Sequence, residues 1–177
     1  MKHLITLALV LFAGTVFGQQ QNQISSTLLQ SIEKDVWVPF MEAYNESNSK
    51  KLKSIHSKDI VRVTVDHNQI ETGEAYLDHF GGFVENVKER GGQLGIAFAI
   101  LTTATNENGT LAHQTGYYRF SSKGPDDKAL KVQGYGHFNV GLKKENGEWK
   151  IWLDSDARTD ISHDDFNSQE IIYELEG

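Results

Sequence analysis

The sequence of 177 residues predicts one α+β domain in which a curved antiparallel sheet wraps around three N-terminal helices. Helical periodicity in the first half of the chain, and β-type segments joined by short turns in the second half, carry this prediction. Glycines inside these segments add curvature, because glycine allows a strand to bend or bulge, and the curvature leaves a pocket at the open end. They are Gly116, Gly134, Gly136 and Gly141.

The helices follow from apolar spacing. Residues 25–47 predict a helix whose apolar side chains recur every four residues, at Ile32, Val36, Phe40 and Tyr44. Pro39 lies inside this stretch and is expected to kink or divide the helix, because proline lacks an N–H and crowds the preceding turn. A short helix is expected over 49–56, and a third opens at Thr72–Gly73 and ends at Gly91–Gly92.

The strands follow from β-branched and alternating segments bounded by turn residues. The expected strands are 60–65, 69–71, 93–105, 111–121, 129–144 and 149–156. Asn146–Gly147 between the last two is a strong hairpin signal. The last four strands are therefore predicted to form an antiparallel meander.

Composition excludes several classes of function. The chain has 24 acidic and 17 basic residues, a formal net charge of −7, which argues against a nucleic-acid partner. The absence of cysteine excludes a disulfide scaffold, a thiolate zinc site and a cysteine nucleophile. No spacing of histidines and carboxylates fixes a metal site and no glycine-rich phosphate loop follows a strand, so we expect no metal and no cofactor.

The N-terminus predicts export. Lys2 and His3 precede the apolar run 4–12, and a small-residue stretch ends at Gly18, a pattern typical of a secretory signal peptide. We expect a signal peptide over 1–18 cleaved near Gly18, a polar linker over 19–27, the domain over 28–159, and a tail over 160–177 with a short helix begun by Asp164 or Asp165. The expected location is secreted or periplasmic, without membrane insertion after cleavage; an uncleaved anchor is the alternative.

Three segments resemble a known superfamily. Residues 37–45 (WVPFMEAYN) are similar to the first helix of the nuclear transport factor 2-like superfamily, 56–63 to its helix-to-strand junction, and 143–151 with Asp154 to its closing hairpin. The resemblance covers roughly 28–159. It implies a cone-shaped, cystatin-like sheet around three helices, an enclosed pocket and a homodimer through the sheet face.

The superfamily includes ketosteroid isomerase, scytalone dehydratase, limonene-epoxide hydrolase, SnoaL-like polyketide cyclases and non-catalytic binding domains. The chain resembles secreted SnoaL-like proteins of unknown function, so the resemblance supports the fold and leaves the chemistry open. No clear base matches the isomerase pattern. In the cyclase-like members an aspartate and a histidine act as acid and base, and His137 with Asp154 or Asp156 is the nearest set here.

Strand alternation groups the candidate site residues by face. If the polar faces line the pocket, His137 is the base or acid, Asp154 or Asp156 orients it, and Tyr117 and Arg119 stabilise an oxyanion. The expected ligand-binding walls are Trp37, Phe40, Tyr44, His113, Tyr135, Asn139 and Trp152. The alternative is that these faces meet solvent or a dimer partner, and a bulge at Gly134 or Gly136 exchanges the two faces.

The sequence thus favours an exported pocket protein for a small, partly apolar organic molecule, with cofactor-free acid–base chemistry of the isomerase, dehydratase or cyclase type. Whether it is an enzyme stays open. The alternatives are a non-catalytic binding or dimerisation module and a periplasmic small-molecule carrier. A small-molecule ligand and a second copy of the chain are the expected partners.

Overall fold

An almost continuous helix at the start of the domain follows the predicted apolar repeat. The computed structural model describes residues 24–175, so the expected signal peptide lies outside the described residues. α1 (Ser26–Ile32) passes through a π-helical turn (Glu33–Trp37) into α2 (Val38–Asn45). Ile32, Val36, Phe40 and Tyr44 are all buried, as the spacing predicts.

Pro39 does not divide this helix. The chain instead widens into the π-helical turn just before it, where the amide of Val38 donates to the carbonyl of Glu33, five residues back. Proline offers no amide and crowds the carbonyl four residues earlier, and one wider turn accommodates both effects. The predicted kink is therefore replaced by a π-turn.

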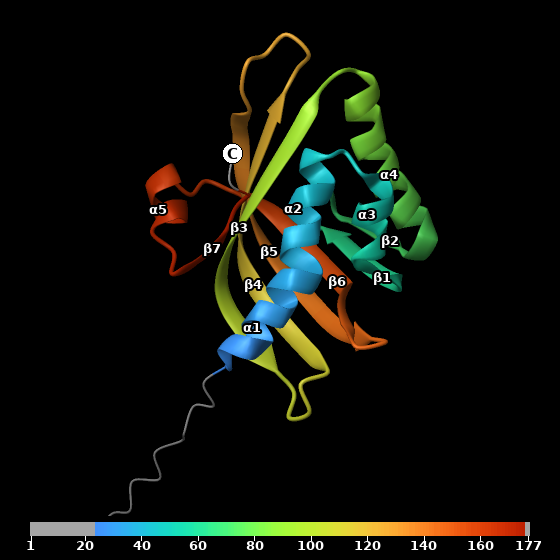
Figure 1. Ribbon diagram of the computed structural model, residues 1–177, viewed down its shortest axis with the longest axis vertical. Coiled ribbons are helices and arrows are strands. Elements are labelled where there is room, and N and C mark those ends of the chain that lie inside the picture. The colour runs from blue at the N-terminus through green and yellow to red at the C-terminus, as the bar shows by residue number, and fades with distance from the viewer. Residues whose placement is uncertain (1–23, 176–177) are drawn as a thin grey trace, which may run out of the picture.

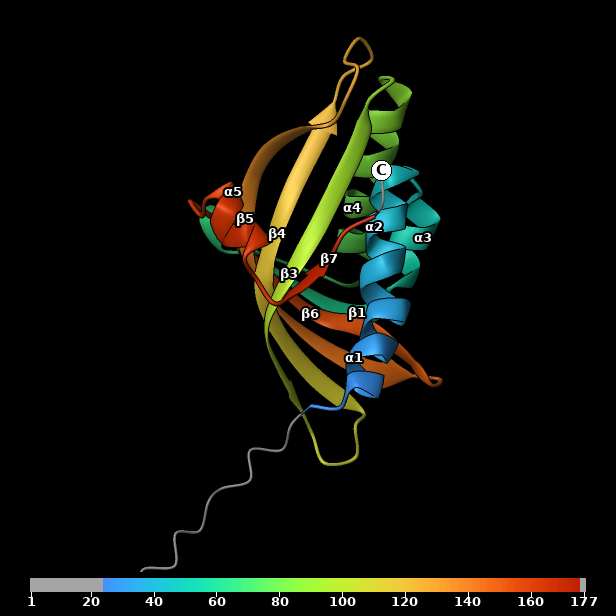
Figure 2. The ribbon, with the colours of Figure 1, turned by 60° about the vertical axis from the view of Figure 1, so that its left-hand side comes forward.

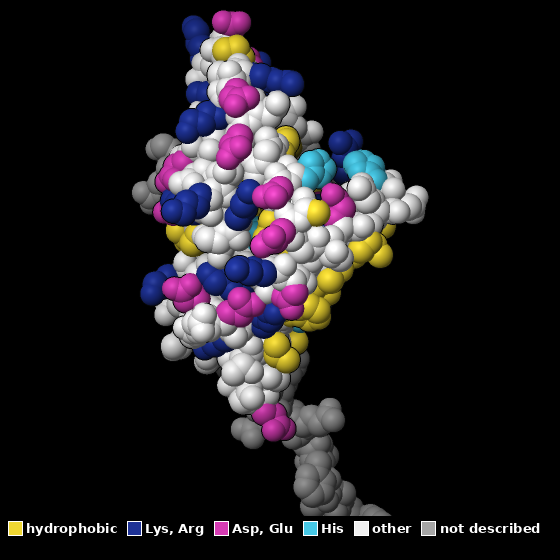
Figure 3. All heavy atoms as spheres, turned by 90° about the vertical axis from the view of Figure 1, so that its right-hand side faces the viewer, with side chains coloured by type: hydrophobic (Ala, Val, Ile, Leu, Met, Phe, Trp, Pro, Cys, Tyr) yellow, Lys and Arg dark blue, Asp and Glu magenta, His cyan; other side chains and the backbone are white. Residues whose placement is uncertain are grey.

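Two further helices complete the layer that packs on the sheet (Figure 1). α3 (Ser49–Ser54) begins at Asn48, whose side chain accepts from the amide of Lys51. α4 (Gly73–Glu89) packs against α3, and Gly81 provides the room, since a Cβ there would lie 2.5 Å from Cε of Lys53. Basic and acidic side chains are interspersed over this side of the molecule (Figure 3).

Seven strands form one sheet in the order β2-β1-β6-β5-β4-β3-β7. The strands are β1 (His56–Thr64), β2 (Gln69–Thr72), β3 (Gln93–Thr105), β4 (Leu111–Lys123), β5 (Lys131–Glu145), β6 (Glu148–Thr159) and β7 (Ile171–Tyr173). β3 to β6 form the predicted antiparallel meander, whereas β1 pairs in parallel with β6. The sheet curls around α1 and α2 without closing (Figure 2), which confirms the predicted α+β class.

The principal core lies between the helices and the inner face of the sheet. Its aromatic centre is Trp37, whose ring centroid lies 4.6 Å from that of Phe98 and 5.2 Å from that of Phe138. The indole of Trp37 donates to the fully buried amide of Gln114 at 2.9 Å. This bond satisfies two polar groups that would otherwise be buried without partners.

A smaller core lies on the outer face of the sheet, under the C-terminal tail. The tail forms α5 (His163–Asn167) and then β7, which pairs with β3. Phe166 of α5 is completely buried against Ala97 and Ala99 of β3. The tail therefore covers the part of the outer face that belongs to β3 and β4 (Figure 1). No helix among residues 24–175 is both long and apolar enough to cross a membrane.

His56, at the junction of α3 and β1, is a buried histidine inside the principal core. Its Nδ1 lies 2.8 Å from the carbonyl oxygen of Leu52, and its Nε2 has no hydrogen-bond partner among the described residues. The ring packs against Phe40 and Phe80. Burial is the main cause that lowers the pKa of His56 to about 4; the Leu52 carbonyl opposes this shift and the positive charge of Arg62 adds to it. The imidazole is therefore neutral at pH 7.

The first prediction concerns sheet curvature. Gly116→Ala should lower the free energy of unfolding by about 1–3 kcal/mol, because the added Cβ meets the backbone oxygen of Ala99 and lies 2.6 Å from the ring of Phe138. Gly134→Ala is the matched control, since nothing lies within 4 Å of a Cβ there, and should leave stability unchanged or raise it by up to about 1 kcal/mol. Urea unfolding measures both, and equal losses would contradict the close approach at Gly116.

The second prediction concerns pH. Below about pH 6.5 the unfolded chain protonates His56 while the folded chain does not, so this contribution to stability is complete near pH 7 and is lost toward pH 4. Between pH 7 and 4.5 the wild type should therefore lose about 2–3 kcal/mol more unfolding free energy than His56→Gln. Exposed His67 gives the control variant His67→Gln, which should keep the wild-type slope. Identical slopes in the wild type and His56→Gln would refute the assignment.

Candidate functional site

A cavity of about 530 Å³ lies between the inner face of the sheet and the helices. About half of its lining residues are aromatic, contributed by the π-helical turn, α2, α4 and the central strands. Phe83, Gln133, Arg158 and Asp160 are exposed and also line it, so they mark its open side. The aromatic lining residues are Trp37, Phe40, Tyr44, Phe80, Phe83, Phe98, Tyr118, Phe120, Tyr135 and Phe138.

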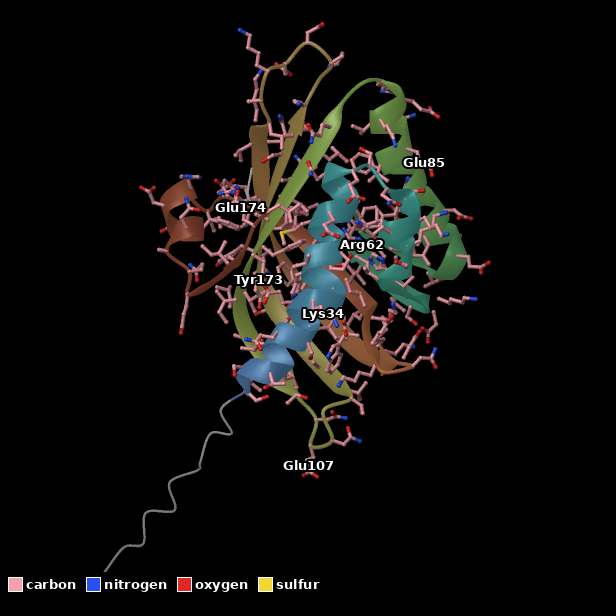
Figure 4. All side chains as sticks on the ribbon, viewed as in Figure 1. Lys34, Arg62, Glu85, Glu107, Tyr173 and Glu174 are labelled. Atoms are coloured by element: carbon pink, nitrogen blue, oxygen red, sulfur yellow. The ribbon has the colours of Figure 1, made fainter. Side chains whose placement is uncertain are left out.

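The polar end of the cavity is an ion network across β1 and β6. Arg62 of β1 stands in register with Asp154 of β6. Its Nη1 lies 2.7 Å from Oδ2 of Asp154, and its Nη2 donates to Oδ1 of Asp156 at 2.6 Å. Figure 4 labels Arg62 in the middle of the molecule, between the helices and the sheet. One guanidinium thus holds two carboxylates.

Tyr118 of β4 extends the network. Its hydroxyl donates to Oδ2 of Asp156 at 3.0 Å, and its ring lies over Gly136 on the neighbouring strand, where a Cβ would collide with it. Gly136 therefore positions the phenol. Burial and the charge of Asp156 raise the pKa of Tyr118 far above its ordinary value, so the phenol stays protonated as a donor.

The environment shifts the ionisation of the other groups too. Burial raises the pKa of Asp154, which Arg62 opposes and Asp156 reinforces. Burial by itself would lower the pKa of Arg62, but Asp154 and Asp156 outweigh it and raise that pKa. Burial also raises the pKa of Tyr44. The polar end therefore contains a proton acceptor stronger than an ordinary aspartate, beside a permanent cation.

The structure brings together only part of the predicted site. Asp154, Asp156, Trp37, Phe40 and Tyr44 line the cavity. Tyr135 borders it, but its ring packs on Phe166 in the smaller, outer core and its hydroxyl lies 3.1 Å from Nδ1 of His163. The expectation that the other predicted residues line it is wrong: in sequence and register they alternate with the inward-facing residues of their strands, and so lie on the outer face. These residues are His113, Tyr117, Arg119, His137, Asn139 and Trp152.

His137 pairs with no carboxylate among the residues that the structure describes. It faces Tyr117 across the strand pair, with ring centroids 5.6 Å apart, and its Nδ1 lies 3.5 Å from Nδ2 of Asn139. Arg119 forms an ion pair with Glu174, and its guanidinium carbon lies 5.1 Å from the ring centroid of Phe166. Both side chains are thus engaged on the side of the sheet opposite to the aspartates.

A bulge explains the wrong grouping. Simple alternation places Trp152 on the same face as Asp154 and Asp156. In the structure Gly141 pairs with Leu153 but Leu142 pairs with Ile151, so Trp152 is an extra residue in β6. The inner face therefore continues from Ile151 to Asp154, and the indole of Trp152 lies over Gly141 on the outer face. One additional residue reverses the side chains that follow it.

Arg62 and Tyr118 were missed by sequence reasoning, and Gly136 was expected to curve its strand but not to position a side chain of the site. Arg62 stands between two valines in a strand. A buried arginine is almost always paired with an opposite charge, so an arginine that alternation places on the inward face of a strand indicates such a pair. Nothing in the sequence distinguishes Tyr118 from its neighbour Tyr117 until it is known which face of the sheet lines the cavity. Within the described part of the chain, no three histidine or acidic side chains converge as a metal site.

Comparisons with known proteins identify the fold. No protein-family model matches the chain, and no curated protein sequence matches it. The solved structure of ActVI-ORFA from Streptomyces coelicolor superposes with a TM-score of 0.63 at 12% identity, covering 77% of this chain and 100% of that chain. A ketosteroid isomerase-like protein from Erwinia carotovora atroseptica gives a TM-score of 0.54 at 14% identity, covering 77% and 100%.

A protein of unknown function with a cystatin-like fold, from Nostoc punctiforme, gives a TM-score of 0.53 at 13% identity and covers 78% of this chain and 96% of that chain. Identities this low concern the fold alone. The chain has the cystatin-like, nuclear transport factor 2-like fold that the resemblance in its sequence predicts.

Proposed function

We propose that this chain is an exported pocket protein that binds a small, partly apolar organic molecule between its helices and its sheet. The cavity carries the proposal: about 530 Å³, with aromatic walls and one compact polar end. This volume and this lining are typical of small-molecule sites, in which apolar walls supply affinity and a few polar groups fix orientation. Binding is the function that the geometry supports best, as in a carrier or a non-catalytic binding module.

Proton transfer is the second candidate, and one observation favours it. Burial raises the pKa of Asp154, which makes it the better proton acceptor at the polar end. Tyr44 lines the same cavity and its raised pKa keeps its hydroxyl protonated, as a donor to a developing oxyanion requires. In this scheme Asp154 takes the place of His137 as base, and Tyr44 takes the place of Tyr117 and Arg119.

The neutral bicyclic ketone 2-tetralone tests both functions. It should bind one-to-one in isothermal titration calorimetry, and Phe120→Ala should weaken binding about tenfold, because it removes an apolar wall. Trp152→Ala is the matched control on the outer face and should leave affinity unchanged. Absence of binding, or an equal loss in both variants, would refute the pocket.

The same samples in D₂O distinguish binding from turnover. Exchange of the acidic protons beside the ketone, faster with wild-type protein than with Asp154→Asn, would support acid–base chemistry. Exchange at the rate of the buffer alone would leave a binding function without turnover.

We further propose a homodimer through the outer face of the sheet, as the resemblance implies. The tail covers the outer face at β3, while on the same face Trp152 of β6 stays 37% exposed and His137 of β5 is half-buried. A second copy would shield these side chains from water. Light scattering at high protein concentration should give twice the monomer mass, and a monomer mass would count against the dimer.

A further inference from the structure

The polar end of the cavity carries an excess negative charge. Two carboxylates, Asp154 and Asp156, face one guanidinium, and their side chains are only 11% and 17% exposed. Arg62 is equally enclosed, with 16% of its side chain exposed. The open side of the cavity adds no net charge, because the charges of Arg158 and Asp160 there cancel. The cavity wall as a whole therefore has a formal charge of −1.

The hydrogen bonds show where this charge is least compensated. Both terminal nitrogens of Arg62 are occupied by the two aspartates. Asp156 uses one oxygen for Arg62 and the other for Tyr118. Asp154 uses Oδ2 for Arg62, and among residues 24–175 no other donor reaches it. The free acceptor of the network is thus Oδ1 of Asp154, at the wall of the cavity.

Charge and wall chemistry both discriminate between ligands. A buried carboxylate that lacks full compensation costs free energy, which a ligand of opposite charge recovers and a ligand of the same charge increases. Arg62 already faces two carboxylates, so its positive charge is more than neutralised and attracts a further anion little. The aromatic walls act in the same direction, because the faces of their rings carry negative potential and attract cations.

We propose that the cavity selects an organic cation: an aromatic or otherwise apolar molecule whose protonated amine binds at Oδ1 of Asp154. This inference rests on the proposed function, since it presupposes that the cavity takes a ligand. The ammonium group donates to Asp154, and the apolar part fills the space between Phe98, Phe120 and Phe138. The bound complex then has a neutral polar end.

Three probes with one ring system and three charges test the inference at pH 7: 1-naphthylmethylamine, 1-naphthylmethanol and 1-naphthoate. By calorimetry the amine should bind at least tenfold more tightly than the alcohol, and the carboxylate most weakly. An alcohol that binds as tightly as the amine, or a carboxylate that binds more tightly than either, would overturn the inference and leave the pocket standing. If none of the three binds, the proposed function falls as well.

Two variants test whether the ammonium group binds at the polar end. Asp154→Asn and Asp156→Asn each remove one negative charge from the polar end and should reduce the ratio of amine to alcohol affinity toward one. Asp126→Asn, in the exposed turn after β4, is the matched control and should keep the wild-type ratio. Circular dichroism verifies folding, and if one variant does not fold the other decides. A ratio unchanged in the folded variants would refute the placement at Asp154.

Discussion

The pairing of Arg62 with Asp154 is the constraint on which the interior depends. It joins β1 to β6 across the only parallel contact in the described sheet. Desolvating charges is expensive, and a buried ion pair adds little net stability compared with apolar side chains of similar volume. Removing Arg62 or Asp154 would nevertheless leave the other charge buried without its partner. The network therefore fixes where β1 lies, and it keeps polar groups in a cavity that apolar side chains could otherwise fill.

The sequence predicted the fold better than the site. Periodicity located the helices and the meander, because an element that is buried on one face has apolar residues at regular intervals in its sequence. That pattern ends wherever the chain adds a residue: Trp152 is one such residue, and alternation therefore grouped it with the two aspartates although it lies on the other face. The aspartates were selected as site residues from the polar face of their strand and from the resemblance to the cyclase-like members. Their partner Arg62 is distant in sequence and becomes visible only when β1 pairs with β6.

The outer face explains why a convincing set of polar residues was not the site. His137, Tyr117 and Arg119 share one face, as strand alternation requires, but that face turns away from the helices. Arg119 is engaged by the tail, between Phe166 and Glu174, whose position beside β7 is labelled in Figure 4. Short-range pattern determines which residues share a face. Only the long-range packing of Trp37 and the strands determines which face encloses the cavity.

Two glycines show how curvature and chemistry are linked. Gly116 admits the ring of Phe138, and Gly136 admits the ring of Tyr118, one strand apart on the same inner face. Because a Cβ at either glycine would collide with the aromatic ring, only glycine lets these rings lie against the neighbouring strand, and glycine also lets the strand bend. The same two contacts set the position of an aromatic wall and of the phenol that holds Asp156. The bend that creates the cavity therefore also orients its polar end, so that shape and chemistry arise from the same residues.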